Sequence, residues 1–185
     1  MDEGLVQKNK DSYSLTTEGK KLADRMSLHT FTKRVQPKIA TLVIFKRKEP
    51  GGKKEILFCK KGKQPFFGYT TLPTGKIHLG EKMYDAARRE LFEKTGLPAD
   101  NIFFIGDVYV ILYKNGELFS HILYHIFEGD SENEIFGNVE NTEDCFWMEA
   151  SKTKKMKCVP GIQEIIEIAS QKNKGIFFQE IALNF

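Results

Sequence analysis

The chain has 185 residues, enough for one well-packed domain of about 150 residues and a shorter additional segment. Hydrophobic residues make up 41% and charged residues 29%, and a net charge of +3 is too small to require a nucleic-acid partner. The sequence has no apolar run near the roughly 18 residues of a membrane span, and its start lacks the apolar core of a signal peptide. We exclude disordered, collagen-like and membrane-spanning chains, and expect a cytoplasmic protein.

The first segment, residues 1–35, differs from the rest in its pattern of apolar and polar residues. Short strands are expected over residues 4–8 and 12–16, on either side of the turn Asn9-Lys10-Asp11. Thr17 is expected to cap a helix that runs to about Met26.

This hairpin and helix resemble the wing and the following helix of winged helix-turn-helix domains. In that family the helices that enter a DNA groove precede the wing, and here no such helices precede it. Three alternatives stay open: an arm, a remnant, or the end of a truncated DNA-binding domain. DNA is expected as a partner only in the third case, whereas an arm exchanged between two copies would give a homodimer.

Residues 36–185 are predicted to form a separate α/β domain. Asn115-Gly116 is typical of a tight hairpin, and Gly96 is typical of a helix end. Mixed strands with one helix in the middle and one near the end predict a sheet between two helical layers. Strands are expected over residues 38–47, 55–60, 103–113, 118–127 and 145–148, and helices over 81–95 and 160–172.

The three cysteines are far apart in the sequence and form no CxxC motif. This spacing indicates neither a disulfide framework nor a zinc site. We predict reduced and mostly buried thiols at Cys59, Cys145 and Cys158.

The residues that carry chemistry lie between Thr74 and Leu97, in the stretch TGKIHLGEKMYDAARRELFEKTGL. Glu90 and Glu93 fall on one face of the expected helix, with Arg89 beside them. Clustered carboxylates repel each other unless a cation lies between them, and Mg²⁺ prefers oxygen ligands, above all where phosphates complete its shell.

The spacing of this stretch resembles the Nudix box, GX5EX7REUXEEXGU, in which U is an aliphatic residue. Gly75 begins the pattern, Glu81 and Arg89-Glu90 follow at the family's spacing, and Gly96-Leu97 ends it. The preceding residues 65–69 and 72–75 resemble the aromatic, LPGG-like lead-in of the family. The resemblance covers roughly residues 36–185 and implies a Nudix-type α/β/α sandwich with a hairpin and helix extension.

The resemblance also implies a reaction and roles for single residues. Nudix hydrolases cleave the pyrophosphate linkage of nucleoside diphosphate derivatives by water attack at phosphorus, with Mg²⁺ or Mn²⁺. Glu90 would bind the metal and help to activate water, Glu93 and the backbone carbonyl of Thr74 would be further ligands, and Arg89 would hold the glutamates. Glu81 would be an outer carboxylate. Substrate contacts are expected from Lys94, Gly75, Phe67 and Tyr69, and a loop base from Glu140 or Glu143, with Asp144 also considered.

One position departs from the family pattern, because Lys94 stands where the box has the second of two adjacent glutamates. The exchange replaces a metal ligand by an ammonium group, which opposes cation binding. Lys94 would swing outward, or contact a substrate phosphate, or mark a site that binds its ligand without hydrolysis. The leading hypothesis is a hydrolase, and the alternatives are a nucleotide sensor that regulates an attached winged-helix segment and an interaction module without a ligand.

Overall fold

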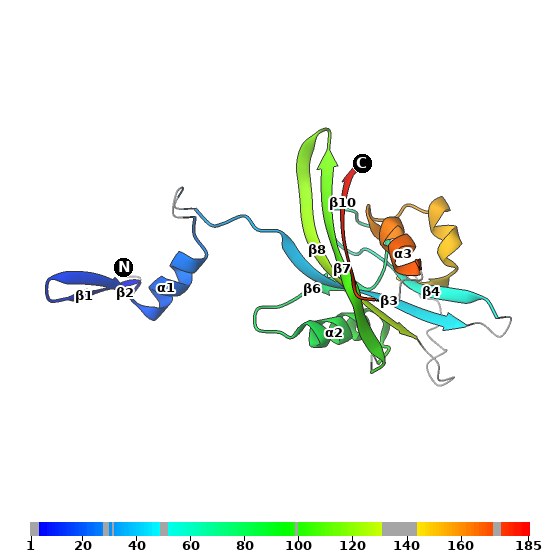
Figure 1. The fold of residues 1–185 in the computed structure, drawn as a ribbon, viewed down its shortest axis with the longest axis horizontal. Helices are drawn as coiled ribbons and strands as arrows, with labels where there is room; N and C mark the ends of the chain where they lie inside the picture. The colour runs from blue at the N-terminus through cyan, green and yellow to red at the C-terminus, as the bar shows by residue number, and fades with distance from the viewer. Residues whose placement is uncertain are drawn as a thin grey trace. The chain divides into compact units, whose positions relative to one another are not determined.

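The computed structural model describes residues 4–27, 30, 32–48, 52–98, 100–130, 144–171 and 175–185. The chain divides into two compact units, Met1–Gln36 and Pro37–Phe185, which we describe one at a time (Figure 1). Within the described residues, no helix is both long and apolar enough to cross a bilayer.

The first unit consists of an antiparallel hairpin and one helix. The hairpin strands, β1 (Val6–Asn9) and β2 (Ser12–Leu15), confirm the predicted pair, and α1 (Thr17–Asp24) follows directly. The predicted cap is wrong by one residue, since the hydroxyl of Thr16 accepts a hydrogen bond from the amide of Gly19 at 3.1 Å. Thr16 still has extended backbone angles, whereas Thr17 is already helical, so only Thr16 can turn its side chain toward the first-turn amides.

The second unit is built on one eight-stranded mixed sheet. The strands pair in the order β10-β7-β8-β3-β4-β5, with β6 beside β3 and β9 beside β4. The β3–β8 and β7–β10 pairs are parallel and the others are antiparallel. The strands are β3 (Lys38–Lys48), β4 (Lys54–Lys60), β5 (Thr70–Thr71), β6 (Thr74–Lys76), β7 (Ile102–Lys114), β8 (Glu117–Asp130), β9 (Cys145–Met148) and β10 (Phe177–Asn184).

Helices cover both faces of this sheet (Figure 1). Along β3, Leu42 packs into the core that α3 (Ile162–Ser170) shares, and the next residue, Val43, packs into the core beneath α2 (Met83–Thr95). This alternation is the period of two that a strand with both faces covered must show. A 3₁₀ helix, η2 (Ala150–Lys155), connects β9 to the segment before α3. The predicted α/β/α arrangement with a mixed sheet is confirmed.

The tight turn between β7 and β8 is also confirmed. Asn115 and Gly116 have φ angles of 53° and 81°. Two successive positive φ values match the twist of the flanking strands, which explains why this dipeptide joins β7 and β8, the longest hairpin among the described residues.

Two helix boundaries and three strands differ from the prediction. Helix α2 begins at Met83 and not at Glu81, because Lys82 is still extended, and α3 begins at Ile162 after Gly161, whose φ of 94° is not helical. The sequence did not predict β5, β6 or β10. The first two are only two and three residues long, and β10 depends on a distant parallel partner, β7.

Candidate functional site

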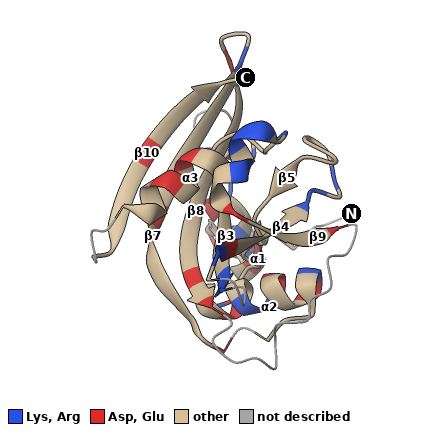
Figure 2. Cartoon of the chain, turned by 90° about the vertical axis from the view of Figure 1, so that its right-hand side faces the viewer, with Lys and Arg blue, Asp and Glu red and all other residues tan. Residues whose placement is uncertain are grey.

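Helix α2 places the predicted site residues because one side of it is anchored in the core. Ala86, Ala87 and Leu91 are fully buried, and Gly96 ends the helix with a φ of 70° that favours glycine. The amide of Gly96 donates to the carbonyl oxygen of Phe92 at 2.8 Å and closes the last turn. The remaining surface of α2 carries charges of both signs (Figure 2).

Arg89 lies at the centre of this charged surface. Its Nε and Nη2 atoms donate to the two carboxylate oxygens of Glu81 at 2.7 and 2.9 Å. Its Nη1 atom donates to Glu90 Oε1 at 2.9 Å and to Glu93 Oε2 at 3.4 Å. One guanidinium therefore holds the three glutamates that the sequence singled out, with the two-pronged geometry that arginine offers to a carboxylate.

These contacts set the charge state of Glu81. Hydrogen bonds from Arg89 and, second, from the backbone amide of His78 lower the pKa of Glu81 to about 2. Hydrogen bonds to Glu81 and, second, to Glu90 raise the pKa of Arg89 above its ordinary value. Glu81 is thus an anion throughout the neutral range, and it fixes the guanidinium that reaches Glu90 and Glu93.

Glu90 is buried against the backbone of the loop before the helix. It is 8% exposed, and a Cβ atom added to Gly75 would lie 1.8 Å from its carboxyl carbon. Gly75 lies in β6 opposite Thr41 of β3, so the sheet holds the loop in place. The contact of Gly75 explains why the box pattern begins with a glycine, and its predicted contact with substrate stays a prediction.

Lys94 lies one helical turn beyond Glu90, with its Nζ atom 3.1 Å from Glu90 Oε2. Glu90 Oε1 accepts from Arg89, so each oxygen of this carboxylate contacts a cationic side chain. The predicted departure from the box is therefore part of an ion pair with the main predicted metal ligand, and Lys94 does not point away from it.

The chemistry of the donors fits a hard divalent cation, although the described residues contain no group of three or more histidine, cysteine or acidic side chains arranged around one point. Glu90 and Glu93 offer carboxylate oxygens one turn apart, and Glu93 is 57% exposed at its side chain and can turn. Thr74 lies in β6, where its hydroxyl donates to the carbonyl oxygen of Thr41 at 2.6 Å. A cation bound through Glu90 Oε2 would have to displace Lys94.

The aromatic residues expected at the substrate lie in a different environment. Tyr69 packs on Phe66, with ring centroids 5.4 Å apart, and Phe66 contacts Phe119 and Phe185. Lys157 lies over the ring of Tyr69 at 4.4 Å, and Phe67 is 64% exposed.

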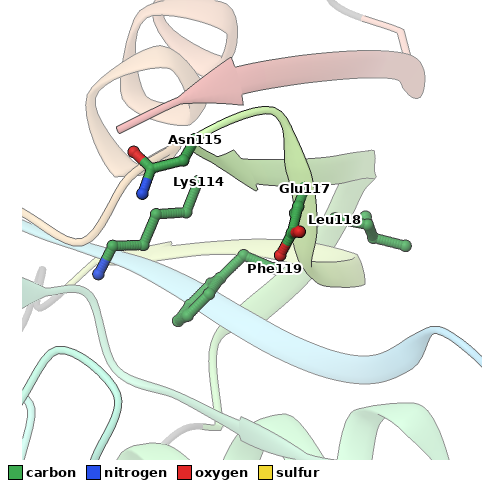
Figure 3. Close-up of a pocket in the computed structure, with 5 residues that line it drawn as sticks. All are labelled: Lys114, Asn115, Glu117, Leu118 and Phe119. Carbon is green, nitrogen blue, oxygen red and sulfur yellow. The ribbon is translucent and has the colours of Figure 1, made fainter.

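A pocket of about 310 Å³ adjoins this aromatic cluster at the turn between β7 and β8 (Figure 3). Phe119 belongs to both the pocket and the cluster. The residues that line it are Lys114, Asn115, Glu117, Leu118 and Phe119. Sequence reasoning did not select them as a site, because a hairpin tip carries no motif beyond its turn.

Sequence reasoning did not predict one polar pair in the sheet, between β7 and β8. His125 Nδ1 of β8 lies 2.7 Å from Asp107 Oδ1 on the neighbouring strand β7. On the same strand, the ring of His121 lies against that of Tyr109 in a tilted arrangement, with centroids 4.3 Å apart. Asp107, an acidic residue between apolar neighbours in β7, was the available signal for this pair.

The predicted loop bases Glu140 and Glu143 lie outside the described residues. Asp144 is exposed, and its carbonyl oxygen accepts from the amide of Lys60 at 2.6 Å as β9 begins. The structure thus brings together Gly75, Glu81, Arg89, Glu90, Glu93 and Lys94.

Comparison with known proteins agrees with this geometry. The family model described as the NUDIX domain matches residues 18–167. The chain therefore belongs to the NUDIX family. A search of curated proteins gave no match.

Among solved structures, the NUDIX domain of Shewanella oneidensis NrtR, complexed with ADP ribose, is 17% identical, with a TM-score of 0.61 over 85% of this chain and 99% of that one. A MutT protein from Bacillus halodurans is 16% identical, with a TM-score of 0.60 over 80% of this chain and 90% of that one. The Ap4A hydrolase of C. elegans is 18% identical, with a TM-score of 0.54 over 73% of this chain and 97% of that one. Another NrtR structure, 16% identical with a TM-score of 0.60 over 71% of this chain, is covered over only 60% of its own length. At these identities the similarity establishes the fold.

Proposed function

We propose that the chain is a divalent-metal-dependent hydrolase that cleaves the pyrophosphate linkage of a nucleoside diphosphate derivative by water attack at phosphorus. The observation that carries this proposal is the Arg89 centre, which holds Glu81, Glu90 and Glu93 together while Glu90 rests on Gly75. Membership of the NUDIX family supports it, as do neighbours whose names include an Ap4A hydrolase and an ADP ribose complex.

Mg²⁺ or Mn²⁺ would be held by Glu90, Glu93 and the backbone carbonyl of Thr74, and would neutralise the charge of the two linked phosphates. Arg89 keeps Glu90 Oε1 in place, which leaves Glu90 Oε2 as the oxygen that would bind the metal and help to activate the attacking water. Glu81 fixes the guanidinium through two bonds and so positions the other carboxylates. The loop base assigned to Glu140 or Glu143 stays a prediction.

Lys94 is the residue that sets the strength of this activity. Its ammonium competes with the metal for Glu90 Oε2, at a distance of 3.1 Å. Once displaced, the ammonium is free to contact a phosphate oxygen, as one of the sequence-based alternatives holds. We therefore propose weak turnover by the natural sequence.

The test is phosphate release from a panel of nucleotide pyrophosphates with Mg²⁺ or Mn²⁺, run on the natural sequence and on two variants. We expect weak turnover of the natural sequence, none for Glu90→Gln and a gain for Lys94→Glu, which restores the box. Turnover that Glu90→Gln leaves unchanged would show that the reaction takes place elsewhere. Asp24→Asn, in the first unit, is the control for loss of a carboxylate outside the site.

A second candidate function is a nucleotide sensor that acts through the first unit. Two observations favour it: the Glu90–Lys94 ion pair, and the compact hairpin and helix that precede the domain. A neighbour of the same fold, Shewanella oneidensis NrtR, has been crystallised with a 27mer DNA. The sensor is preferred if no variant turns over any substrate while calorimetry still detects nucleotide binding. Loss of both turnover and nucleotide binding would favour the third alternative, an interaction module without a ligand.

A further inference from the structure

Two cysteine side chains lie close together beneath the C-terminal end of helix α2. Cys59 of β4 and Cys145 of β9 are register partners in an antiparallel pair, and both are buried. The third cysteine, Cys158, is half-buried in a different part of the domain and donates weakly to the carbonyl oxygen of Thr153 at 3.7 Å. The sequence predicted all three to be reduced and mostly buried, because they are far apart in the chain and form no CxxC motif.

The register places Cys59 and Cys145 in the closer of the two kinds of cross-strand pair. The amide of Lys60 donates to the carbonyl oxygen of Asp144 at 2.6 Å, so the pair one step along is hydrogen-bonded. Hydrogen-bonded and non-hydrogen-bonded pairs alternate along an antiparallel ladder, and the second kind has Cα atoms about 4.5 Å apart. That separation lies within the range of roughly 4.4–6.8 Å over which a disulfide can form.

The thiol of Cys145 also contacts helix α2. Cys145 Sγ donates to the backbone carbonyl oxygen of Lys94 at 3.3 Å. Lys94 lies in the last turn of α2, and its ammonium is the group paired with Glu90. The thiol of Cys145 therefore supports the backbone of the residue that departs from the box pattern.

We propose that Cys59 and Cys145 form a reversible disulfide, and that its formation releases the end of α2 at Lys94. The two S–H bonds break and one S–S bond forms, while the two protons and two electrons that the thiols give up reduce one molecule of a peroxide oxidant. With hydrogen peroxide, the O–O bond breaks and two molecules of water form. A disulfide sulfur carries no hydrogen, so the bond from Cys145 to the Lys94 carbonyl is lost in the oxidised form.

Two further observations fit this step. The hydrogen bond from Cys59 lowers the pKa of Cys145 and raises that of Cys59, which makes Cys145 the better nucleophile toward a peroxide. Both thiols are buried, so a peroxide reaches them when β9 opens locally. Strand β9 can open because it has only four residues and, in the described part of the chain, pairs with β4 alone. The inference goes beyond the proposed function and does not depend on hydrolysis.

The first experiment treats the folded chain with hydrogen peroxide, alkylates the remaining thiols and maps them by peptide mass spectrometry. We expect Cys59 and Cys145 to lose alkylation together and to appear as one linked peptide pair, while Cys158 stays alkylated. Cys158→Ser should give the same linked pair, and Cys145→Ser should give none. A chain in which Cys59 and Cys145 stay alkylated under conditions that oxidise Cys158 would overturn the proposal.

The second experiment tests the link to the box by amide hydrogen exchange of residues 91–96 in the reduced and oxidised chain. We expect exchange at the end of α2 to become at least about threefold faster on oxidation, the effect of losing one modest hydrogen bond. Cys145→Ala, which removes the same donor without a disulfide, should accelerate exchange in the reduced chain. Equal exchange in both redox states would overturn the coupling to Lys94. Because neither readout involves substrate, a failure of the proposed hydrolase would be seen separately.

Discussion

Lys94 changes the chemistry available to Glu90, because it gives this carboxylate a covalently attached cationic partner that competes with a metal ion. The pair is spaced by four residues on one helix, the spacing at which such side chains meet, and its Nζ–Oε2 distance is 3.1 Å. The sequence alone could have predicted this contact. The family resemblance also predicted that Arg89 would hold the glutamates, but not that Arg89 and Lys94 would each contact a different oxygen of Glu90.

Gly75 offers a direct test of the packing at the site. Gly75→Ala should destabilise the domain by about 1–3 kcal/mol, because the added methyl group would overlap the buried carboxylate of Glu90, whose carboxyl carbon lies 1.8 Å from the built Cβ position. Urea denaturation measures the change in free energy of unfolding. Gly62→Ala is the matched control, since a Cβ atom at Gly62 would meet nothing within 4 Å. Equal effects of both substitutions would refute the packing explanation.

The lowered pKa of Glu81 predicts that the free energy of unfolding depends on pH in the acidic range. Its pKa falls from 4.5 to about 2 on folding, so its contribution is complete above pH 4.5 and is lost as the pH falls toward 2. The difference in free energy of unfolding between the natural sequence and Glu81→Gln should therefore shrink across this window. Denaturant titrations at several pH values measure it. Glu117→Gln, at the exposed β7–β8 turn, shows whether loss of any one carboxylate has the same effect; a difference that stays constant with pH would contradict the prediction.

At the scale of single elements, the cap of α1 can be tested because two threonines stand side by side. Thr16→Ala should speed amide exchange at Gly19 by about fivefold, the result of losing a capping bond of about 1 kcal/mol. Thr17→Ala should leave this amide unchanged, since Thr17 is already inside the helix. Thr16→Ser keeps the hydroxyl and should restore slow exchange. The prediction fails if Thr17→Ala has the larger effect.

The elements that could be predicted are those whose signals are local. Asn115-Gly116 defines a turn by its own backbone preferences, and Gly96 ends α2 for the same reason. By contrast, β10 is a strand because β7 lies beside it, with Phe177 opposite Gly106, and no residue in the intervening sequence indicates that partner. The box could be predicted because Gly75, Glu81 and Glu90 follow one another within a single loop and helix, whereas the meeting of Cys59 with Cys145 depends on the register of β4 and β9.

At the scale of the whole molecule, the division into two units predicts where a protease cuts first. Val35 is fully exposed near the end of the first unit, next to Arg34, whose amide donates to the carbonyl oxygen of Arg25 at 3.0 Å. Brief digestion with trypsin should cut first after Arg34 and leave a stable fragment that begins at Val35, identified by intact mass. Arg34→Gln should delay this cut.

The outcome also bears on where the domain begins, because the family match starts at residue 18, inside α1. A fragment beginning at Val35 that unfolds at the same temperature as the intact domain would place the boundary after α1. A fragment that is degraded at once would show that the first unit belongs to the folded domain.

The parallel pairing of β3 with β8 has a consequence for how fast the chain folds. The side chain of Lys38 in β3 donates to Ser120 in β8, a partner 82 positions along the chain. Joining strands this far apart loses chain entropy before any contact compensates for it, so folding should be slow compared with that of a helical protein of equal size. The contacts of Arg89 with Glu81, Glu90 and Glu93 span at most eight positions of the chain and can form early. The rate at which the protein reaches its native state is therefore set by closure of the sheet, while the charged cluster on α2 forms within one local segment of the chain.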